Sequence, residues 1–137
     1  MKRLFPDHTI IETEHFIVNQ DWEVPIAGFF IVAAKREMRS VMDFSDEEAI
    51  DFIRLLAKVR KGMKDILGIE ECYIFQNEDT EHDYHLWIFP RYGWMVRFGK
   101  RIESVRPIIE YAKKNMTDEK NMSLVDDYVN RMRQYLN

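Results

Sequence analysis

Residues 83–91 read Asp83-Tyr84-His85-Leu86-Trp87-Ile88-Phe89-Pro90-Arg91. Before the proline this run is short, apolar and rich in aromatic residues, which predicts a buried strand over residues 84–89. Side chains alternate between the two faces of a strand, so Asp83, His85 and Trp87 are expected on one face. A histidine in such a strand is either a hydrogen-bonded core residue or a reactive group, and the strand alone favours the core residue.

A long helix is predicted upstream of this strand. It begins at Ser45, whose hydroxyl can form a capping box with the side chain of Glu48. Apolar residues then recur at spacings of mostly three and four until Gly68 ends the pattern. Two further helices are predicted near the C-terminus, one beginning close to Pro107 and one beginning at Asp118.

Three other segments have the composition of strands, namely residues 15–20, 28–34 and 72–77. The order of strands, helix, strands and helices favours an α+β fold, with an antiparallel sheet and a long helix packed on one face. A doubly wound parallel sheet would alternate strands and helices throughout. We expect the strands over 28–34, 72–77 and 84–89 to be neighbours.

The composition is that of one ordinary globular domain over residues 1–137, with 46% hydrophobic and 32% charged residues. The net charge of −4 argues against non-specific nucleic-acid binding, which usually needs a basic excess. No apolar run approaches the ~20 residues of a membrane span, and no signal peptide is recognisable. Cys72 is the one cysteine, which excludes an internal disulfide and any multi-cysteine metal site. A cytoplasmic protein is therefore expected.

The segment around His85 resembles the signature of the histidine triad (HIT) family, in which histidine alternates with apolar residues three times and often precedes Pro-Arg. Aligned on Pro90-Arg91, the middle histidine falls on His85, the first on Asp83 and the third on Trp87. The resemblance covers roughly residues 9–95 and implies a HIT-like fold. A C-terminal helical extension, at about 103–136, lies outside that shared part.

The resemblance also implies a binding site for a small-molecule nucleotide, without a cofactor or a metal. Family members use the middle histidine as a nucleophile on an α-phosphate, which assigns catalysis to His85 through a nucleotidyl-histidine that water or another acceptor resolves. A two-fold homodimer is implied too, with the two sheets joined and a helix from each chain at the interface. The implied ligand-binding residues are Asp21, Trp22, Asn77, Asp83, Trp87 and Arg91. Among them, Asp21 and Trp22 stand where the family has the pair that holds ribose and base.

Several positions depart from the family pattern or have a second interpretation. Only seven residues separate Asn77 from His85, so the Gly-Ser/Thr loop that contacts the phosphate in the family is missing. Asp21 and Asn77 also suit turns, and both tryptophans suit a core. A non-catalytic module that binds a nucleotide or a protein is therefore the alternative function. A zinc hydrolase ranks third, because a spacing of three places His82 and His85 on opposite faces of a strand.

Trp87 leads to a prediction about the leaving group. The third histidine of the family can assist its departure, whereas an indole nitrogen does not release a proton near neutral pH. We therefore expect activity to be confined to good leaving groups, such as pyrophosphate, and phosphoramidates to react slowly. If an acid comes from elsewhere, His82 in the preceding turn is the first candidate.

Two patterns lie beyond the strand of His85. A basic run is either solvated surface or an anion-binding site, and it contains Arg91, Arg97, Lys100, Arg101 and Arg106. One apolar face of the last helix is predicted to pack internally, with a partner interface as the alternative. That face contains Met122, Val125, Val129, Met132 and Leu136.

Overall fold

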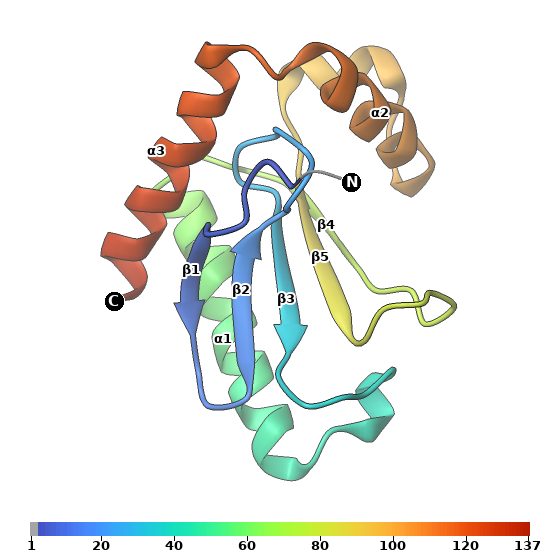
Figure 1. Ribbon diagram of the computed structural model, residues 1–137, viewed down its shortest axis with the longest axis vertical. Helices are drawn as coiled ribbons and strands as arrows, with labels where there is room; N and C mark the ends of the chain where they lie inside the picture. Colours follow the sequence, from blue (N-terminus) through green and yellow to red (C-terminus); the bar gives the residue numbers. More distant parts are fainter. Residues whose placement is uncertain (1–2) are drawn as a thin grey trace.

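Five strands form one antiparallel sheet in the computed structural model, which describes residues 3–137 (Figure 1). Their spatial order is β1-β2-β3-β5-β4, which confirms the α+β class and the predicted neighbours. β1 was not predicted, because it is short and pairs at the edge of the sheet with a register shift. The strands are β1 (Thr9–Glu12), β2 (Phe16–Gln20), β3 (Phe30–Ala34), β4 (Cys72–Phe75) and β5 (His85–Pro90).

The long helix α1 (Asp46–Asp65) begins at the predicted capping box. The hydroxyl of Ser45 accepts a hydrogen bond from the amide of Glu48 at 3.1 Å, and the Glu48 carboxylate accepts one from the amide of Ser45 at 2.7 Å. These two bonds satisfy amide groups that a helix start leaves without partners. Gly68, just past the helix, has a φ of +71°, which a residue with a side chain rarely adopts.

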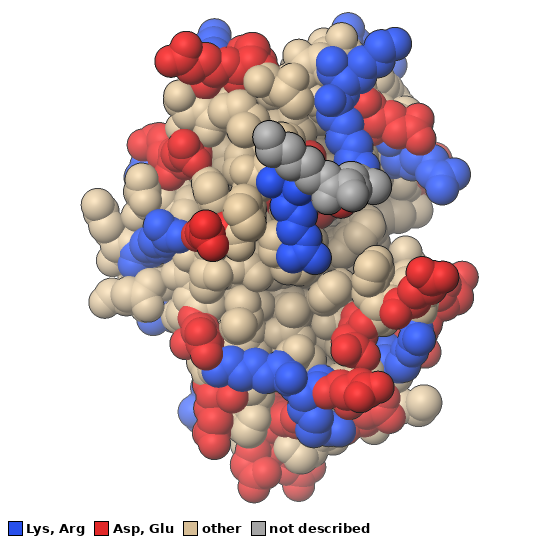
Figure 2. All heavy atoms as spheres, viewed as in Figure 1, with Lys and Arg blue, Asp and Glu red and all other residues tan. Residues whose placement is uncertain are grey.

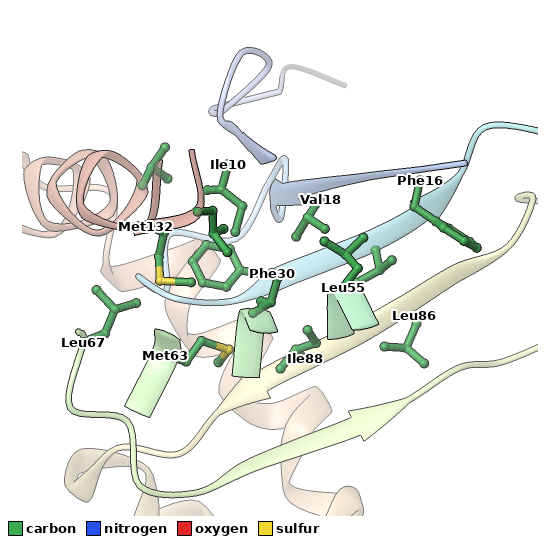
Figure 3. Close-up of a cluster of buried hydrophobic side chains, with 14 of the residues drawn as sticks. Ile10, Phe16, Val18, Phe30, Leu55, Met63, Leu67, Leu86, Ile88 and Met132 are labelled. Carbon is green, nitrogen blue, oxygen red and sulfur yellow. The ribbon is translucent and has the colours of Figure 1, made fainter. Parts of the chain in front are cut away.

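The main hydrophobic core fills the space between the sheet, α1 and the C-terminal helix α3 (Glu119–Leu136) (Figure 3). Val18, Val32 and Ile88 point into it from three strands, and Val59 meets them from α1. α3 contacts both β1 and α1, so it completes this layer. Its predicted apolar face is internal, with four of the five residues buried and Met122 partly buried.

The opposite face of the sheet is only partly covered. Helix α2 (Val105–Asn115) and the 3₁₀ helix η2 (Gly93–Phe98) lie over one end of it (Figure 1). There they bury a second, smaller cluster, in which Phe29 and Phe89 of the sheet region meet Met95 and Ile108. Two further 3₁₀ turns, η1 (Val41–Asp43) and η3 (Ile102–Ser104), lie in the connections before α1 and α2.

Charged side chains are unevenly distributed over the face shown in Figure 2. Lys and Arg gather at the upper right, over the region of α2, whereas Asp and Glu predominate toward the lower end and around the loop between β4 and β5. Within residues 3–137, no helix combines the length and the apolar character needed to cross a membrane.

Candidate functional site

Strand β5 places neighbouring residues on two different surfaces. Leu86 and Ile88 point into the core beside α1. His85 and Trp87 lie on the opposite face and are half-buried. In the pairing with β3, His85 lies opposite Ala33, at the end of the sheet that α2 does not cover. The predicted alternation therefore leaves the imidazole accessible from the open face.

Asp21 follows β2 and is nearly buried. Its Oδ1 accepts hydrogen bonds from the amides of Glu23 and Val24, both at 2.9 Å, so one carboxylate oxygen caps the turn. No hydrogen bond within residues 3–137 engages Oδ2, and the side chain borders an open cavity. Burial raises the pKa of Asp21 above its ordinary value, and the two amides oppose that rise.

Trp22 is a wall of this cavity rather than a core residue. Its ring centroid lies 5.5 Å from that of His85, with the planes inclined by 54°. The guanidinium of Arg3 lies 4.9 Å from the Trp22 ring centroid, in a cation–π contact. The backbone amides of Leu4 and Phe5 donate to the Trp22 carbonyl at 2.8 and 3.0 Å, which holds the N-terminal segment here.

The cavity itself has a volume of about 350 Å³. That volume lies within the range of small-molecule sites in proteins, which are typically concave and partly aromatic. One cation, two acids and two imidazoles surround an apolar and aromatic floor. The lining residues are Arg3, Asp21, Trp22, Glu23, Ile31, His82, His85 and Trp87.

Two further hollows adjoin this cavity along the open face, and Trp87 borders all three. A small hollow of about 50 Å³ lies beside His85 and is bordered by Asn77, Thr80, His82 and Asp83. A larger one of about 480 Å³ lies under α2, and its lining includes Phe75, Asn77, Trp87, Val105, Ile109, Arg106 and Lys113. We call the three together the open-face groove.

The surroundings of His85 favour its neutral form. Burial lowers the pKa of its imidazole, and the neighbouring His82 lowers it further, while Asp83 acts in the opposite direction. No hydrogen bond joins either ring nitrogen to another group within residues 3–137. A neutral imidazole retains the lone pair that nucleophilic attack requires.

The prediction that His82 and His85 lie on opposite faces of a strand is wrong. β5 begins at His85, and His82 belongs to the preceding turn, where strand alternation does not apply. The two ring centroids lie 5.8 Å apart, with planes inclined by 32°. Over residues 3–137, no group of three or more His, Cys, Asp or Glu side chains is placed to hold a metal ion.

Asp83 and Asn77 reach the small hollow from the loop between β4 and β5. Both are exposed, and Asp83 lies in the turn rather than in the strand. The Asp83 carboxylate makes no hydrogen bond to His85, so its influence on the imidazole is electrostatic and acts through space.

Arg91 is not brought to the open-face groove. Its guanidinium donates to the Ser104 hydroxyl at 3.2 Å and to the Gly99 carbonyl at 2.9 Å. It also lies 5.3 Å from the ring centroid of Tyr73. These contacts fix the loop before α2, and Arg91 lines a separate cavity of about 390 Å³.

The rest of the basic run is divided between different places. Lys100 and Arg101 line the same separate cavity as Arg91. Arg97 lies over the ring of Tyr111, 4.5 Å from its centroid. Arg106 borders the open-face groove from α2. The basic residues that lie close together in the sequence therefore do not form a single cationic surface.

A larger cavity, of about 620 Å³, lies elsewhere, near the start of α1. The lysine and the arginine that line it are already paired with carboxylates. Arg36 donates to both carboxylate oxygens of Glu48, at 3.0 and 2.9 Å, and Lys35 pairs with Glu12 at 2.5 Å. These pairs tie the segment after β3 to α1 and to the sheet edge, so this cavity is a less suitable site than the open-face groove despite its size.

Sequence reasoning missed two contributors to the groove. Arg3 has no local pattern that marks it, because it reaches Trp22 only through the fold of the N-terminal segment. Lys113 of α2 lines the groove and pairs with Glu23 at 3.4 Å. The sequence shows that Arg106 and Lys113 are positively charged, but it does not show that they lie beside Trp87.

Comparison with solved structures identifies the fold. A hypothetical histidine triad nucleotide-binding protein from Sulfolobus tokodaii superposes with a TM-score of 0.65 at 14% identity, over 94% of this chain and 85% of that one. A zinc-bound histidine triad family protein from Mycobacterium smegmatis gives 0.63 at 17% identity, over 96% and 84%. A HIT-like protein involved in cell-cycle regulation from Bartonella henselae gives 0.62 at 17%, over 93% and 84%. No family model and no curated protein matches the sequence.

The chain therefore has the histidine triad (HIT-like) fold, as the segment around His85 predicted. The superpositions cover more than nine-tenths of the chain, so they extend beyond residues 9–95 into the C-terminal helices.

Proposed function

We propose that this protein binds a nucleotide in the open-face groove and acts on it as a nucleotidyl hydrolase or transferase through His85. One observation carries the proposal. Asp21, Trp22 and His85, which the resemblance assigns to ribose, base and phosphate, come from two distant parts of the sequence and line the same cavity. Its volume of about 350 Å³ suits a ligand of this class.

Each of these side chains has a suitable chemical role. Trp22 offers an aromatic surface on which a base can stack. The free Oδ2 of Asp21 can accept hydrogen bonds from ribose hydroxyls. The cations Arg3 and Arg106 border the groove from two sides and offset the charge that Asp83 presents to a phosphate.

His85 would then attack the α-phosphorus with its neutral imidazole. Burial lowers the pKa of that imidazole and so favours the neutral form that attack requires. A nucleotidyl-histidine forms, and water or another acceptor completes the reaction. Asn77 borders the hollow beside His85 and can donate a hydrogen bond to the phosphate from its side-chain amide.

A non-catalytic binding module is the second candidate, and one observation favours it. A histidine nucleophile is normally oriented by a hydrogen bond to its second nitrogen. Such a bond is not formed by His85 with any group in residues 3–137. A module of this kind would bind a nucleotide through Trp22 and Asp21 without turning it over.

Turnover and binding separate the two candidates. We expect wild-type protein to hydrolyse nitrophenyl esters of nucleoside monophosphates, and His85→Ala to lose that turnover while still binding a nucleoside monophosphate. His15→Ala is the matched control, because His15 lines the separate cavity near α1. Binding by wild type without any turnover would establish the module instead, and a protein that does neither would contradict both candidates.

We further propose that the chain forms a two-fold homodimer. β4 is an edge strand, and its Ile74 is 45% exposed in the isolated chain. α1 also presents Ile50 and Ile53 to solvent, at 51% and 58% exposure. An unpaired strand edge can join the sheet of a second chain, and the exposed apolar residues of α1 can pack against the same helix of that chain. Light scattering at tens of micromolar is the test, and a monomer would contradict the proposal.

A cytoplasmic location is part of the same proposal. Cys72 is a free, half-buried thiol, which suits a reducing compartment. Cell fractionation with an antibody to the chain would test the location, and recovery in a secreted or membrane fraction would contradict it.

A further inference from the structure

Two imidazole rings lie side by side in the open-face groove, although only one of the three histidine positions of the family pattern holds a histidine in this chain. His82 and His85 have ring centroids 5.8 Å apart, and both border the cavity of about 350 Å³ and the small hollow beside it. The position of Trp87, where the family pattern has its third histidine, borders the same hollows. The groove thus lacks an imidazole at residue 87 and contains an additional one at residue 82.

The turn that carries His82 is held in place by side chains. The hydroxyl of Thr80 accepts a hydrogen bond from the His82 amide at 3.3 Å. Arg39 donates to the Thr80 carbonyl, and the Gln76 side-chain amide donates to the Arg39 carbonyl at 3.1 Å. These bonds connect the loop after β4 to the segment before α1, and they fix the backbone of the turn that carries His82.

The two imidazoles differ in their surroundings. His82 is exposed, whereas His85 is half-buried, and burial disfavours the charged form of a side chain. The half-buried ring therefore suits the neutral nucleophile, and the exposed ring lies within reach of the leaving group. The other charged groups of the cavity are Arg3 from the N-terminal segment, Asp83 from the turn, and the acids Asp21 and Glu23 from the loop after β2.

We propose that His82 donates the proton to the leaving group, and that nucleoside phosphoramidates and other substrates with poor leaving groups are therefore within the range of this site. The inference rests on the proposed nucleotidyl transfer through His85. It replaces the expectation that only good leaving groups react, which assumed that no acid stood in for the third histidine. An exposed imidazole beside a half-buried one, both bordering the same cavity, suits a division into acid and nucleophile.

The reaction balances with water as the second reactant. A lone pair of neutral His85 forms a bond to the α-phosphorus, and the bond from phosphorus to the leaving oxygen or nitrogen breaks. The electron pair of that bond stays on the leaving atom, which takes the proton from His82. Water then attacks the nucleotidyl-histidine, the phosphorus–nitrogen bond breaks, and His82 accepts the proton that water loses. Both histidines return to their starting forms.

A series of nucleotidyl substrates with graded leaving-group pKa tests this role. We expect His82→Gln to lower kcat/KM for a phosphoramidate by ~10²–10⁴-fold, the usual contribution of general acid catalysis, and to cause a much smaller loss for a nitrophenyl ester. The alkaline limb of the pH profile for the phosphoramidate should disappear in the variant. Free imidazole should restore part of the phosphoramidate activity of His82→Gly.

Two controls separate proton donation from a structural effect. The unfolding midpoint of His82→Gln should equal that of wild type, and His15→Gln, outside the groove, should behave as wild type in every assay. An equal loss for every leaving group, or none for any, would overturn the role of His82 and leave the role of His85 standing. Absence of turnover in wild type for the whole series would overturn both.

Discussion

On the face of the sheet that α1 and α3 cover, Val32 and Ile88 are fully buried, whereas on the opposite face His85 and Trp87 are only half-buried. The covered face consists of interlocking apolar side chains. The open face is covered by α2 at one end only, and polar and aromatic groups remain accessible in the groove beyond it. Adjacent residues of β5 therefore belong to the core on one face and to the proposed binding site on the other, and substitutions should separate the two roles.

The largest effect on stability is expected at Ile88, and its neighbour Trp87 provides the contrast. Ile88→Ala should lower the free energy of unfolding by about 2–5 kcal/mol, because it leaves a cavity in the main core. Trp87→Ala should lower it by less, because the indole is half-buried, and should weaken nucleotide binding. Chemical denaturation measures the first quantity and calorimetric titration the second. Equal destabilisation by both variants would show that side chains on the open face are packed as tightly as those on the covered face.

Loss of the proposed ribose contact of Asp21 should lower nucleotide affinity without unfolding the protein. Hydrogen bonds to a charged acceptor contribute about 1.5–3 kcal/mol each, so Asp21→Asn should weaken nucleoside monophosphate binding by about tenfold or more. Asparagine retains an oxygen that can accept from the amides of Glu23 and Val24, whereas alanine would leave both without that acceptor. Unchanged affinity with an unchanged unfolding midpoint would reject the ribose contact.

A smaller effect, restricted to stability, is expected at the start of α1. Ser45→Ala removes the acceptor for the Glu48 amide and should lower the free energy of unfolding by about 0.5–2 kcal/mol. The groove lies on the other side of the sheet, so kcat/KM and nucleotide affinity should not change. A parallel loss of affinity at temperatures where the variant is fully folded would mean that the two faces are coupled.

The smallest effect concerns pH. Hydrogen bonds from Arg36, and then from the Ser45 amide, lower the pKa of Glu48 from 4.5 to about 2. Because the folded state favours the charged form, this stabilisation is complete above pH 4.5 and is lost as the pH falls toward about 2. Arg36 is half-exposed, so solvent screens the pair and keeps this contribution small. The stability difference between wild type and Glu48→Gln should shrink over that range; a constant difference would contradict this account.

Local patterns predicted much of the covered face. Alternation in 84–89 and the capping box at Ser45 are properties of short segments, and the structure has β5 and α1 where these patterns placed them. The fold followed from the residues around His85, which are neighbours in sequence. Among the strands, β1 was not predicted, because a short edge strand has little apolar pattern of its own.

The open face was predicted less completely, because its parts meet only in the folded chain. Asp21 and Trp22 were found through the resemblance and do lie at the cavity with His85. Arg91 was expected there too, but its guanidinium is used by the loop before α2. His82 was assigned to the wrong face, because a strand was extended through a turn whose geometry depends on Thr80 and Arg39.

The central claim is that His85 becomes covalently nucleotidylated. Wild-type protein mixed with a nitrophenyl ester of a nucleoside monophosphate, quenched under alkaline conditions that preserve a phosphorus–nitrogen bond, can be examined by mass spectrometry of the intact chain and its peptides. The account predicts a mass increase of one nucleotidyl group, located on His85 and absent from His85→Ala. Turnover without any adduct in rapid-quench samples, or an adduct on His82 instead, would contradict it.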